Sequence, residues 1–87
     1  MKVLVFTKNN LSYSEEQAIG DFERTLKSSD CDVEKVDLEE QGGSLKARVY
    51  DIFTAPSVII TTNDGAYIHG WLGSLPTASE VKHYIMV

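Results

Sequence analysis

The side chains of this sequence that could do chemistry are few, and they are scattered along the chain. Its 87 residues hold one cysteine, Cys31, and two histidines, His69 and His83. A dithiol–disulfide cycle needs one thiol to attack and a second thiol to release the mixed disulfide. The cysteine, histidines and carboxylates match no metal-ligand spacing. We therefore expect that this chain is not a dithiol oxidoreductase and that it has no metal site.

Three hydroxyl side chains, Ser12, Tyr13 and Ser14, stand where a helix is predicted to begin. Ser12 precedes Glu15 by three residues, which is the spacing of a capping box. Ser14 precedes Gln17 by the same spacing, so either pair can cap the helix. We interpret the serines first as helix caps and Tyr13 as a cover for the preceding loop.

Cys31 follows the predicted end of this helix and is flanked by acidic residues. Negative neighbours raise the pKa of a thiol and so disfavour the reactive thiolate. We interpret Cys31 as a small, partly buried residue. A site of incidental oxidation or dimerisation is the alternative interpretation.

The net charge of −5 argues against a nucleic-acid backbone or an anionic membrane as partner. Six acids and one lysine between residues 30 and 40 account for that whole charge. We interpret this segment as a solvated sheet edge, with a docking face for a basic partner as the alternative.

No apolar run approaches the ~20 residues that cross a bilayer, and one cysteine gives no sign of an oxidising compartment. A cytoplasmic location is therefore expected.

Apolar periodicity predicts seven elements in a single domain over residues 1–87. The predicted strands cover residues 3–6, 31–38, 57–62 and 66–71. Three helices are predicted. The first begins at residue 12 or 14 and ends at 28–30, the second covers residues 44–51, and the third runs from 78 to 85. The Gln-Gly-Gly-Ser segment at 41–44 is expected to end the second strand. The order β-α-β-α-β-β-α predicts an α/β fold with a four-stranded mixed sheet and helices on both faces.

Each predicted helix has an apolar face that should pack on the sheet. The predicted inner faces are Ala18, Ile19, Phe22 and Leu26 on the first helix, Leu45, Val49 and Ile52 on the second, and Ala78, Val81, Tyr84 and Ile85 on the third. A capping box of Thr77 and Glu80 should begin the last helix. Trp71 is expected to pack in the interior.

Residues 6–14, Phe-Thr-Lys-Asn-Asn-Leu-Ser-Tyr-Ser, resemble a glutaredoxin segment. In that segment a strand ends in an aromatic, a small hydroxyl residue and a lysine, and Cys-Pro-Tyr-Cys then opens a helix. Leu11 stands at the nucleophilic cysteine, Ser12 at the proline, Tyr13 at the tyrosine, and Ser14 at the resolving cysteine. The sequence therefore resembles the thioredoxin-like superfamily without its thiols.

Residues 50–58, Tyr-Asp-Ile-Phe-Thr-Ala-Pro-Ser-Val, resemble the thioredoxin and glutaredoxin segment that ends in the family's cis-proline. The Asn-Asp-Gly at 63–65, the Gly-Ser-Leu at 73–75 and the helix after them resemble the C-terminal half of thioredoxin. The Gly-Gly and paired-Asp motif with which glutaredoxins bind glutathione is absent. The resemblance covers nearly the whole chain and implies a thioredoxin-like fold.

The resemblance implies a cis Ala55–Pro56 bond facing the loop of residues 9–13. It leaves the backbone before the proline free to pair with an extended peptide or with glutathione. The implied groove consists of Lys8, Asn10, Leu11, Ser12, Tyr13, Ser14, Thr54, Ala55, Pro56 and Gly73. We therefore expect a redox-inactive domain, with no cofactor, that binds an extended peptide or a partner protein around Leu11 and Pro56.

The alternative function is that of an enzyme that uses glutathione. Glutathione transferases use a serine or tyrosine hydroxyl near the start of the equivalent helix to stabilise a thiolate, so Ser12, Tyr13 or Ser14 could serve a glutathione-dependent, glutaredoxin-like enzyme. Those enzymes also need a second helical domain, for which 87 residues leave no room. A third possibility is a structural subunit whose groove is filled by another chain. Fold alone does not decide among the three.

Overall fold

Strands and helices alternate in the order that the sequence predicts. The computed structural model describes residues 1–29 and 31–85. Its elements are β1 (Lys2–Thr7), α1 (Tyr13–Ser28), β2 (Asp32–Asp37), α2 (Gln41–Val49), β3 (Ser57–Thr61), β4 (Tyr67–Trp71) and α3 (Ala78–Ile85). The predicted α/β order β-α-β-α-β-β-α is confirmed.

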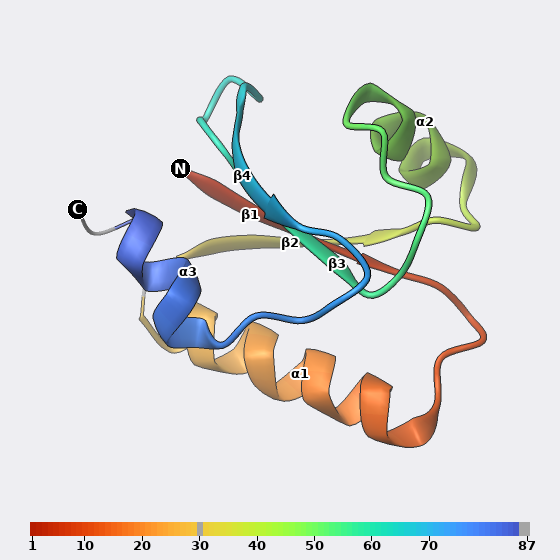
Figure 1. Ribbon diagram of the computed structural model, residues 1–87, viewed down its shortest axis with the longest axis horizontal. Coiled ribbons are helices and arrows are strands. Elements are labelled where there is room, and N and C mark those ends of the chain that lie inside the picture. The colour runs from red at the N-terminus through yellow and green to blue at the C-terminus, as the bar shows by residue number, and fades with distance from the viewer. Residues whose placement is uncertain (30, 86–87) are drawn as a thin grey trace.

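The four strands form one mixed sheet in the order β2-β1-β3-β4. β1 pairs with β2 in parallel, while β3 runs antiparallel to both β1 and β4. Figure 1 shows α1 and α3 on one face of the sheet and α2 on the other. The predicted sheet with helices on both faces is therefore confirmed.

Alternating residues of the central strands supply two cores, one on each face of the sheet. On the α1 and α3 face, Val3, Val5, Val58 and Ile60 pack with Ile19, Phe22, Leu26 and Val81. On the α2 face, Leu4, Phe6, Val36 and Ile59 pack with Ala47 and Ile52. β1 and β3 are buried along nearly their whole length, so they form a fixed platform for the loops at their ends.

α1 begins with the capping box of Ser12 and Glu15, so the first of the two predicted pairs is the one used. The Ser12 Oγ accepts a hydrogen bond from the Glu15 backbone N–H at 3.2 Å, and the Glu15 carboxylate accepts one from the Ser12 N–H at 3.1 Å. Ile19, Phe22 and Leu26 are buried as predicted, whereas Ala18 is exposed. The predicted helix end reaches residue 30, which lies outside the described residues.

α2 departs from the prediction in two ways. It begins at Gln41 and not at residue 44, so the glycines at 42 and 43, expected to lie between strand and helix, are in its first turn. Leu45 and Val49, expected to face the core, are 54% and 75% exposed, and Ala47 is buried in their place, whereas Ile52 is buried as predicted. The close approach of Gly43 to β2 turns the helix so that its small residue meets the sheet: a Cβ on Gly43 would lie 1.9 Å from the Asp37 carbonyl oxygen.

The C-terminal half follows the expected hairpin and helix. Gly65 takes a positive φ of 97° in the turn between β3 and β4, which glycine adopts at little cost. The Thr77 and Glu80 capping box at α3 is confirmed. Val81 is buried as predicted, but Tyr84 is 36% exposed, because its ring stacks on His69 at 4.4 Å instead of entering the core.

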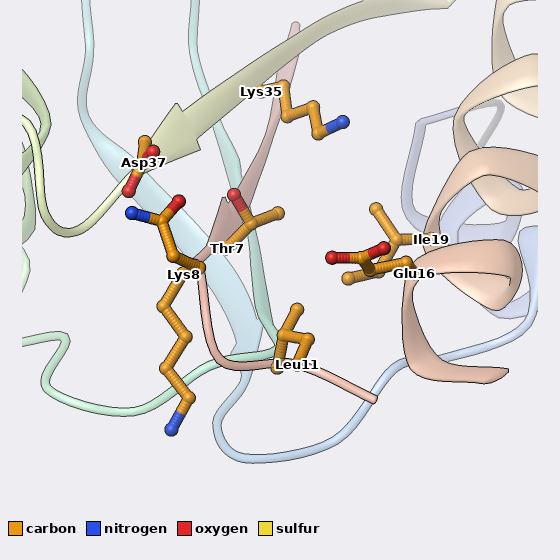
Figure 2. A pocket seen from close by; sticks show the side chains of 8 residues that line it. Thr7, Lys8, Leu11, Glu16, Ile19, Lys35 and Asp37 are labelled. Atoms are coloured by element: carbon orange, nitrogen blue, oxygen red, sulfur yellow. The ribbon is translucent and has the colours of Figure 1, made fainter. Parts of the chain in front are cut away.

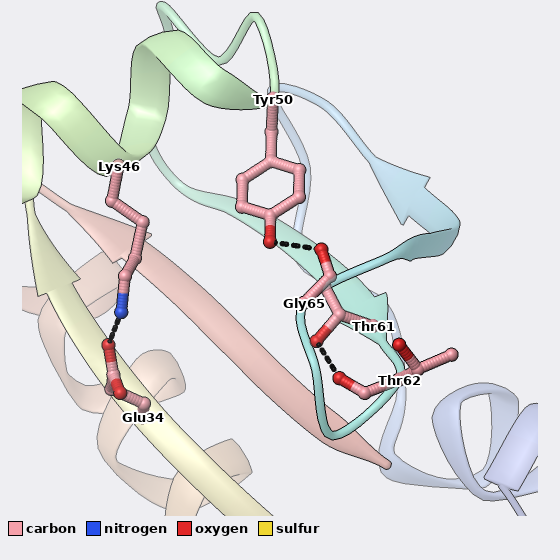
Figure 3. A network of polar contacts seen from close by, with 6 residues as sticks. All are labelled: Glu34, Lys46, Tyr50, Thr61, Thr62 and Gly65. Atoms are coloured by element: carbon pink, nitrogen blue, oxygen red, sulfur yellow. Dashed lines mark hydrogen bonds and ion pairs between the residues drawn. The ribbon is translucent and has the colours of Figure 1, made fainter.

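Polar contacts fasten α2 to its surroundings (Figure 3). The Lys46 Nζ donates to the Glu34 carboxylate of β2 at 2.5 Å, and the Tyr50 hydroxyl donates to the Gly65 carbonyl at 2.5 Å. β2 is an edge strand, as expected for the acidic segment. No helix among the residues described here is long and apolar enough to cross a membrane.

Candidate functional site

The register of the strands brings three loops together at one end of the sheet. Phe6 pairs with Ser57, so the chain leaving β1 lies beside the chain entering β3. Val58 pairs with Trp71, so the chain leaving β4 lies on the other side of that entry. Figure 1 shows these three connections at the same end of the molecule. We call this surface the loop end and define it as residues 8–12, 53–56 and 72–74.

Ser57 ties two of the three loops to each other. Its side chain is fully buried, and its Oγ donates to the Thr54 carbonyl at 2.8 Å. The same Oγ accepts a hydrogen bond from the Gly73 backbone N–H at 3.0 Å. The structure thus brings together Thr54 and Gly73, two of the predicted site residues, through a residue that the sequence reasoning missed. The sequence feature that could have revealed this role is a serine at the start of a mostly apolar strand, directly after a proline.

The segment before β3 presents backbone groups at the loop end. The Ala55–Pro56 peptide bond is cis, and both residues are half-buried. Within the described part of the chain, the Ala55 N–H and C=O take part in no hydrogen bond. Gly73 on the neighbouring loop has a φ of 74°, in the region that favours glycine.

The loop between β1 and α1 carries the residues at which the resemblance places thiols. Leu11 is half-buried and packs against the core on the α1 face. Ser14 is exposed, and its Oγ lies 3.3 Å from the Ser12 Oγ. Tyr13 is 75% exposed, and its hydroxyl accepts a hydrogen bond from the Gln17 Nε2 at 2.7 Å.

The capping box also sets the charge at the start of α1. Hydrogen bonds from the Ser12 backbone N–H and hydroxyl hold the pKa of the Glu15 carboxyl below its ordinary value, with a smaller contribution from the charge of Lys8. A carboxylate is also favoured at a helix N-terminus. The Ser12 side chain is therefore occupied in capping α1.

Lys8 and Asn10, the other two predicted site residues on this loop, are exposed. Lys8 and Leu11 also line a pocket of ≈ 370 Å³ between α1 and β2 (Figure 2). Neither the loop of residues 54–56 nor Gly73 lines that pocket. Since β2 and β3 flank β1 on opposite sides, the loop of residues 8–12 lies between two features: the loops around Ala55 and Gly73 on the β3 side, and a pocket on the β2 side.

Two residues of the loop end carry exposed apolar side chains. Phe53 is 76% exposed and directly precedes Thr54, and Leu72 is 60% exposed and directly precedes Gly73. Leu72 also lines a pocket of ≈ 270 Å³ with Tyr67 and residues 49–52. Large apolar side chains left exposed next to unpaired backbone are typical of a surface that binds another chain.

The remaining reactive groups lie elsewhere. Cys31 is half-buried next to the first residue of β2, and the pairing of Lys2 with Asp32 puts it at the opposite end of the sheet from the loop end. His69 packs between Trp71 and Tyr84, with ring centroids at 4.7 and 4.4 Å. Among the residues that the structure describes, no group of three or more His, Cys, Asp or Glu side chains could hold a metal ion.

By sequence, no protein-family model and no curated protein matches this chain. Comparison by structure gives clear matches, among them three thioredoxins. Thioredoxin 1 from Thermosipho africanus TCF52B superposes with a TM-score of 0.74 at 24% identity, covering 99% of this chain and 91% of that one.

Two further thioredoxins match at lower identity. Thioredoxin O2 from Arabidopsis thaliana gives a TM-score of 0.73 at 18% identity, covering 98% of this chain and 71% of its own. A thioredoxin from Thermus thermophilus gives a TM-score of 0.63 at 20% identity, with the same two coverages of 98% and 71%. Identities this low establish the fold and not the activity. On architecture, strand order and superposition, this chain has a thioredoxin-like fold.

Proposed function

We propose that this domain binds an extended segment of a peptide or partner protein at the loop end and does not catalyse dithiol–disulfide exchange. The observation that carries the proposal is the Ala55 backbone, whose N–H and C=O have no hydrogen-bond partner among the described residues. An extended segment lying beside Ala55 can pair with both groups, as in strand addition.

The surroundings of Ala55 suit such a segment. Side chains of an extended chain alternate in direction, and pockets for alternate side chains provide specificity. Phe53, two residues before Ala55, and Leu72, next to Gly73, offer exposed apolar side chains. The buried Ser57 holds the two loops in place before binding, which reduces the entropy lost when the segment is ordered.

The absence of thiols at this surface supports a role in binding and not in redox chemistry. The nucleophile of a thioredoxin-like reductase must be a thiolate at the start of the first helix. Leu11 and Ser14 occupy the two positions where the resemblance places thiols, and the single cysteine lies at the other end of the sheet. Leucine at position 11 supplies an apolar contact where a reactive group is expected.

A glutathione-dependent enzyme has less support. The chain lacks the Gly-Gly and paired-Asp motif with which glutaredoxins bind glutathione, and the Ser12 hydroxyl already accepts a hydrogen bond in the capping box. An NMR titration with glutathione separates the two functions. We expect no shifts of the Lys8, Tyr13 and Ala55 amides, whereas saturable shifts at all three would favour the enzyme.

The binding proposal can be tested without knowing the partner. Peptides are selected from a displayed random library on the wild-type chain, and their affinities are then measured for two variants. Leu72→Asp places a charge in the apolar contact and should weaken binding at least about tenfold. Leu11→Asp should act in the same direction, with its fold checked by circular dichroism because Leu11 is half-buried.

The matched control is Leu45→Asp, because Leu45 is 54% exposed, close to the 60% of Leu72, but lies on α2 and not on the three loops. We expect its affinity to stay within about twofold of wild type. Equal affinities for the wild type and Leu72→Asp, or a selection that yields no binding peptide, would count against the proposed function.

A further inference from the structure

The two edges of the sheet differ in charge. The strand order β2-β1-β3-β4 leaves one side of β2 and one side of β4 without a strand partner among the described residues. β2 carries four charged side chains in six residues, namely Asp32, Glu34, Lys35 and Asp37. β4 has no Asp, Glu, Lys or Arg, and none occurs anywhere between residues 65 and 77. Charged side chains protect an edge strand from pairing with another chain, so β2 is protected in this way and β4 is not.

β4 also presents apolar surface beside its free edge. Tyr67 is 56% exposed. Its ring lies over Gly70, because a Cβ on Gly70 would be 3.0 Å from the Tyr67 hydroxyl oxygen and 3.3 Å from a ring carbon. Ile68 and Trp71 are half-buried and pack against the core on the α1 face of the sheet. A strand that pairs with β4 therefore meets apolar side chains as well as free backbone groups.

The part of β4 that is ready for a new partner is short. β4 pairs regularly with β3 at residues 69–71, and the irregularity of this pairing lies nearer the hairpin, between Ile60 and Thr61. A bulge bends an edge away from a new partner, so a new strand is expected beside residues 69–71. A contact of this length, with Tyr67 beside it, is small, and small interfaces are typical of weak association.

The distribution of charge favours a second copy of this chain as the partner. The segment at 30–40 accounts for the whole net charge of −5, and it includes β2, at the opposite edge of the sheet from β4. Two copies that meet at β4 keep their acidic segments at the far ends of the assembly, whereas a contact between two β2 edges would bring them together. The strand best suited to β4 is itself uncharged and apolar, and β4 of a second copy meets this requirement.

We propose that two copies of this chain pair through β4 in antiparallel orientation and join their four-stranded sheets into one. A pair related by a two-fold axis uses the same groups on both copies, so each β4 supplies the backbone partners that the other lacks. The interface comprises residues 67–71. These residues lie next to the loop end but are not part of it, so the dimer does not depend on the proposed function.

Sedimentation equilibrium of the wild-type chain from about 20 μM to about 1 mM measures the association. We expect the mean mass to rise with concentration from 9.7 kDa toward twice that value. Because the acidic segments stay apart in the dimer, its dissociation constant should change less than about threefold between low and physiological salt. A chain that is still monomeric at about 1 mM, or a dimer that forms only at high salt, would overturn the proposal.

A matched pair of variants locates the interface. Tyr67→Lys removes the apolar ring and introduces the residue with which natural edge strands prevent pairing, while it makes the net charge less negative. It should raise the dissociation constant at least about tenfold. The control is Leu45→Lys, which makes the same change of charge at a side chain that is 54% exposed on α2, and its dissociation constant should stay within about twofold of wild type. Equal association of the wild type and Tyr67→Lys contradicts an interface at β4.

Amide NMR of the wild-type chain gives a readout that needs no variant. Between dilute and concentrated samples, the amide shifts and the protection from hydrogen exchange should change at residues 67–71. If Tyr67→Lys does not fold, these amides still decide. Concentration-dependent changes at β2 or α2 that leave residues 67–71 unaffected would refute the pairing through β4.

Discussion

Two adjacent glycines in α2 differ sharply in their surroundings, and alanine substitutions at both make a sensitive test of the packing of this helix on β2. A Cβ on Gly42 would meet no atom within 4 Å. A Cβ on Gly43 would lie 1.9 Å from the Asp37 carbonyl oxygen, 2.8 Å from the Asp37 carbonyl carbon and 3.2 Å from a methyl of Val36. Because two of these atoms are backbone, they cannot move away as a flexible side chain would.

The magnitudes follow from two effects. Replacing glycine by alanine inside a helix stabilises a protein by about 0.5–1 kcal/mol, and this gain applies equally to both positions. At Gly43 the new methyl group would also push α2 away from β2, and overpacking of this kind costs about 1–3 kcal/mol. We expect a cost near the upper end of this range, because the methyl group would meet backbone atoms. We expect Gly42→Ala to be about 1 kcal/mol more stable than wild type and Gly43→Ala about 2 kcal/mol less stable.

Thermal and urea unfolding of the three proteins measure these differences. For a domain of this size, 1 kcal/mol shifts Tm by about 4–8 °C. Gly42→Ala should therefore melt several degrees above wild type, and Gly43→Ala about ten degrees below it. Equal stabilisation by both substitutions would refute the close approach of Gly43 to β2, and with it the orientation of α2 that buries Ala47 and exposes Val49.

Two other substitutions test the start of α1. Ser12→Ala removes the cap and should cost about 1 kcal/mol in urea unfolding at neutral pH. It should also return the pKa of Glu15, followed by NMR, toward its ordinary value, since the Ser12 hydrogen bonds lower it. Because the pKa of Glu15 is lower in the folded than in the unfolded protein, its ionised carboxylate stabilises the fold at pH values above the unfolded pKa. This stabilisation is lost as the pH falls through the folded pKa. The difference in unfolding free energy between wild type and Ser12→Ala should therefore shrink on acidification. A difference independent of pH would exclude this charge contribution. Combining Leu11→Cys with Ser14→Cys should raise insulin reduction by dithiothreitol from the background rate, which we expect of wild type, to measurable turnover. Turnover by the wild-type chain would contradict the proposed lack of redox activity.

Much of the architecture could be predicted, because it depends on local signals that are strong in this sequence. The apolar run of β1, the Ser12 and Glu15 capping box, and the Gly65 turn each specify one element or boundary. Once the seven elements are in order, the right-handed crossover leaves few arrangements of the sheet. The resemblance around Pro56 then pointed to one end of that sheet.

The orientation of α2 could not be predicted, because it depends on a contact between segments distant in sequence. The periodicity of Leu45, Val49 and Ile52 favours one helical face, but the approach of Gly43 to Asp37 selects another and leaves Ala47 on the sheet. Tyr84 likewise follows its stacking on His69 and not its helical spacing.

One part of the candidate site was also hidden in the sequence. The role of Ser57 becomes visible only when the loops before β3 and after β4 are placed together.

The central claim is that the Ala55 backbone pairs with an extended segment, and the amide of Ala55 reports this most directly. A peptide selected on the wild-type chain is added to the ¹⁵N-labelled protein, and amide shifts and hydrogen exchange are measured residue by residue. The account predicts that the Ala55 amide moves downfield and gains protection on binding, together with shifts around Gly73. A bound peptide that leaves the Ala55 amide unshifted and unprotected would contradict it.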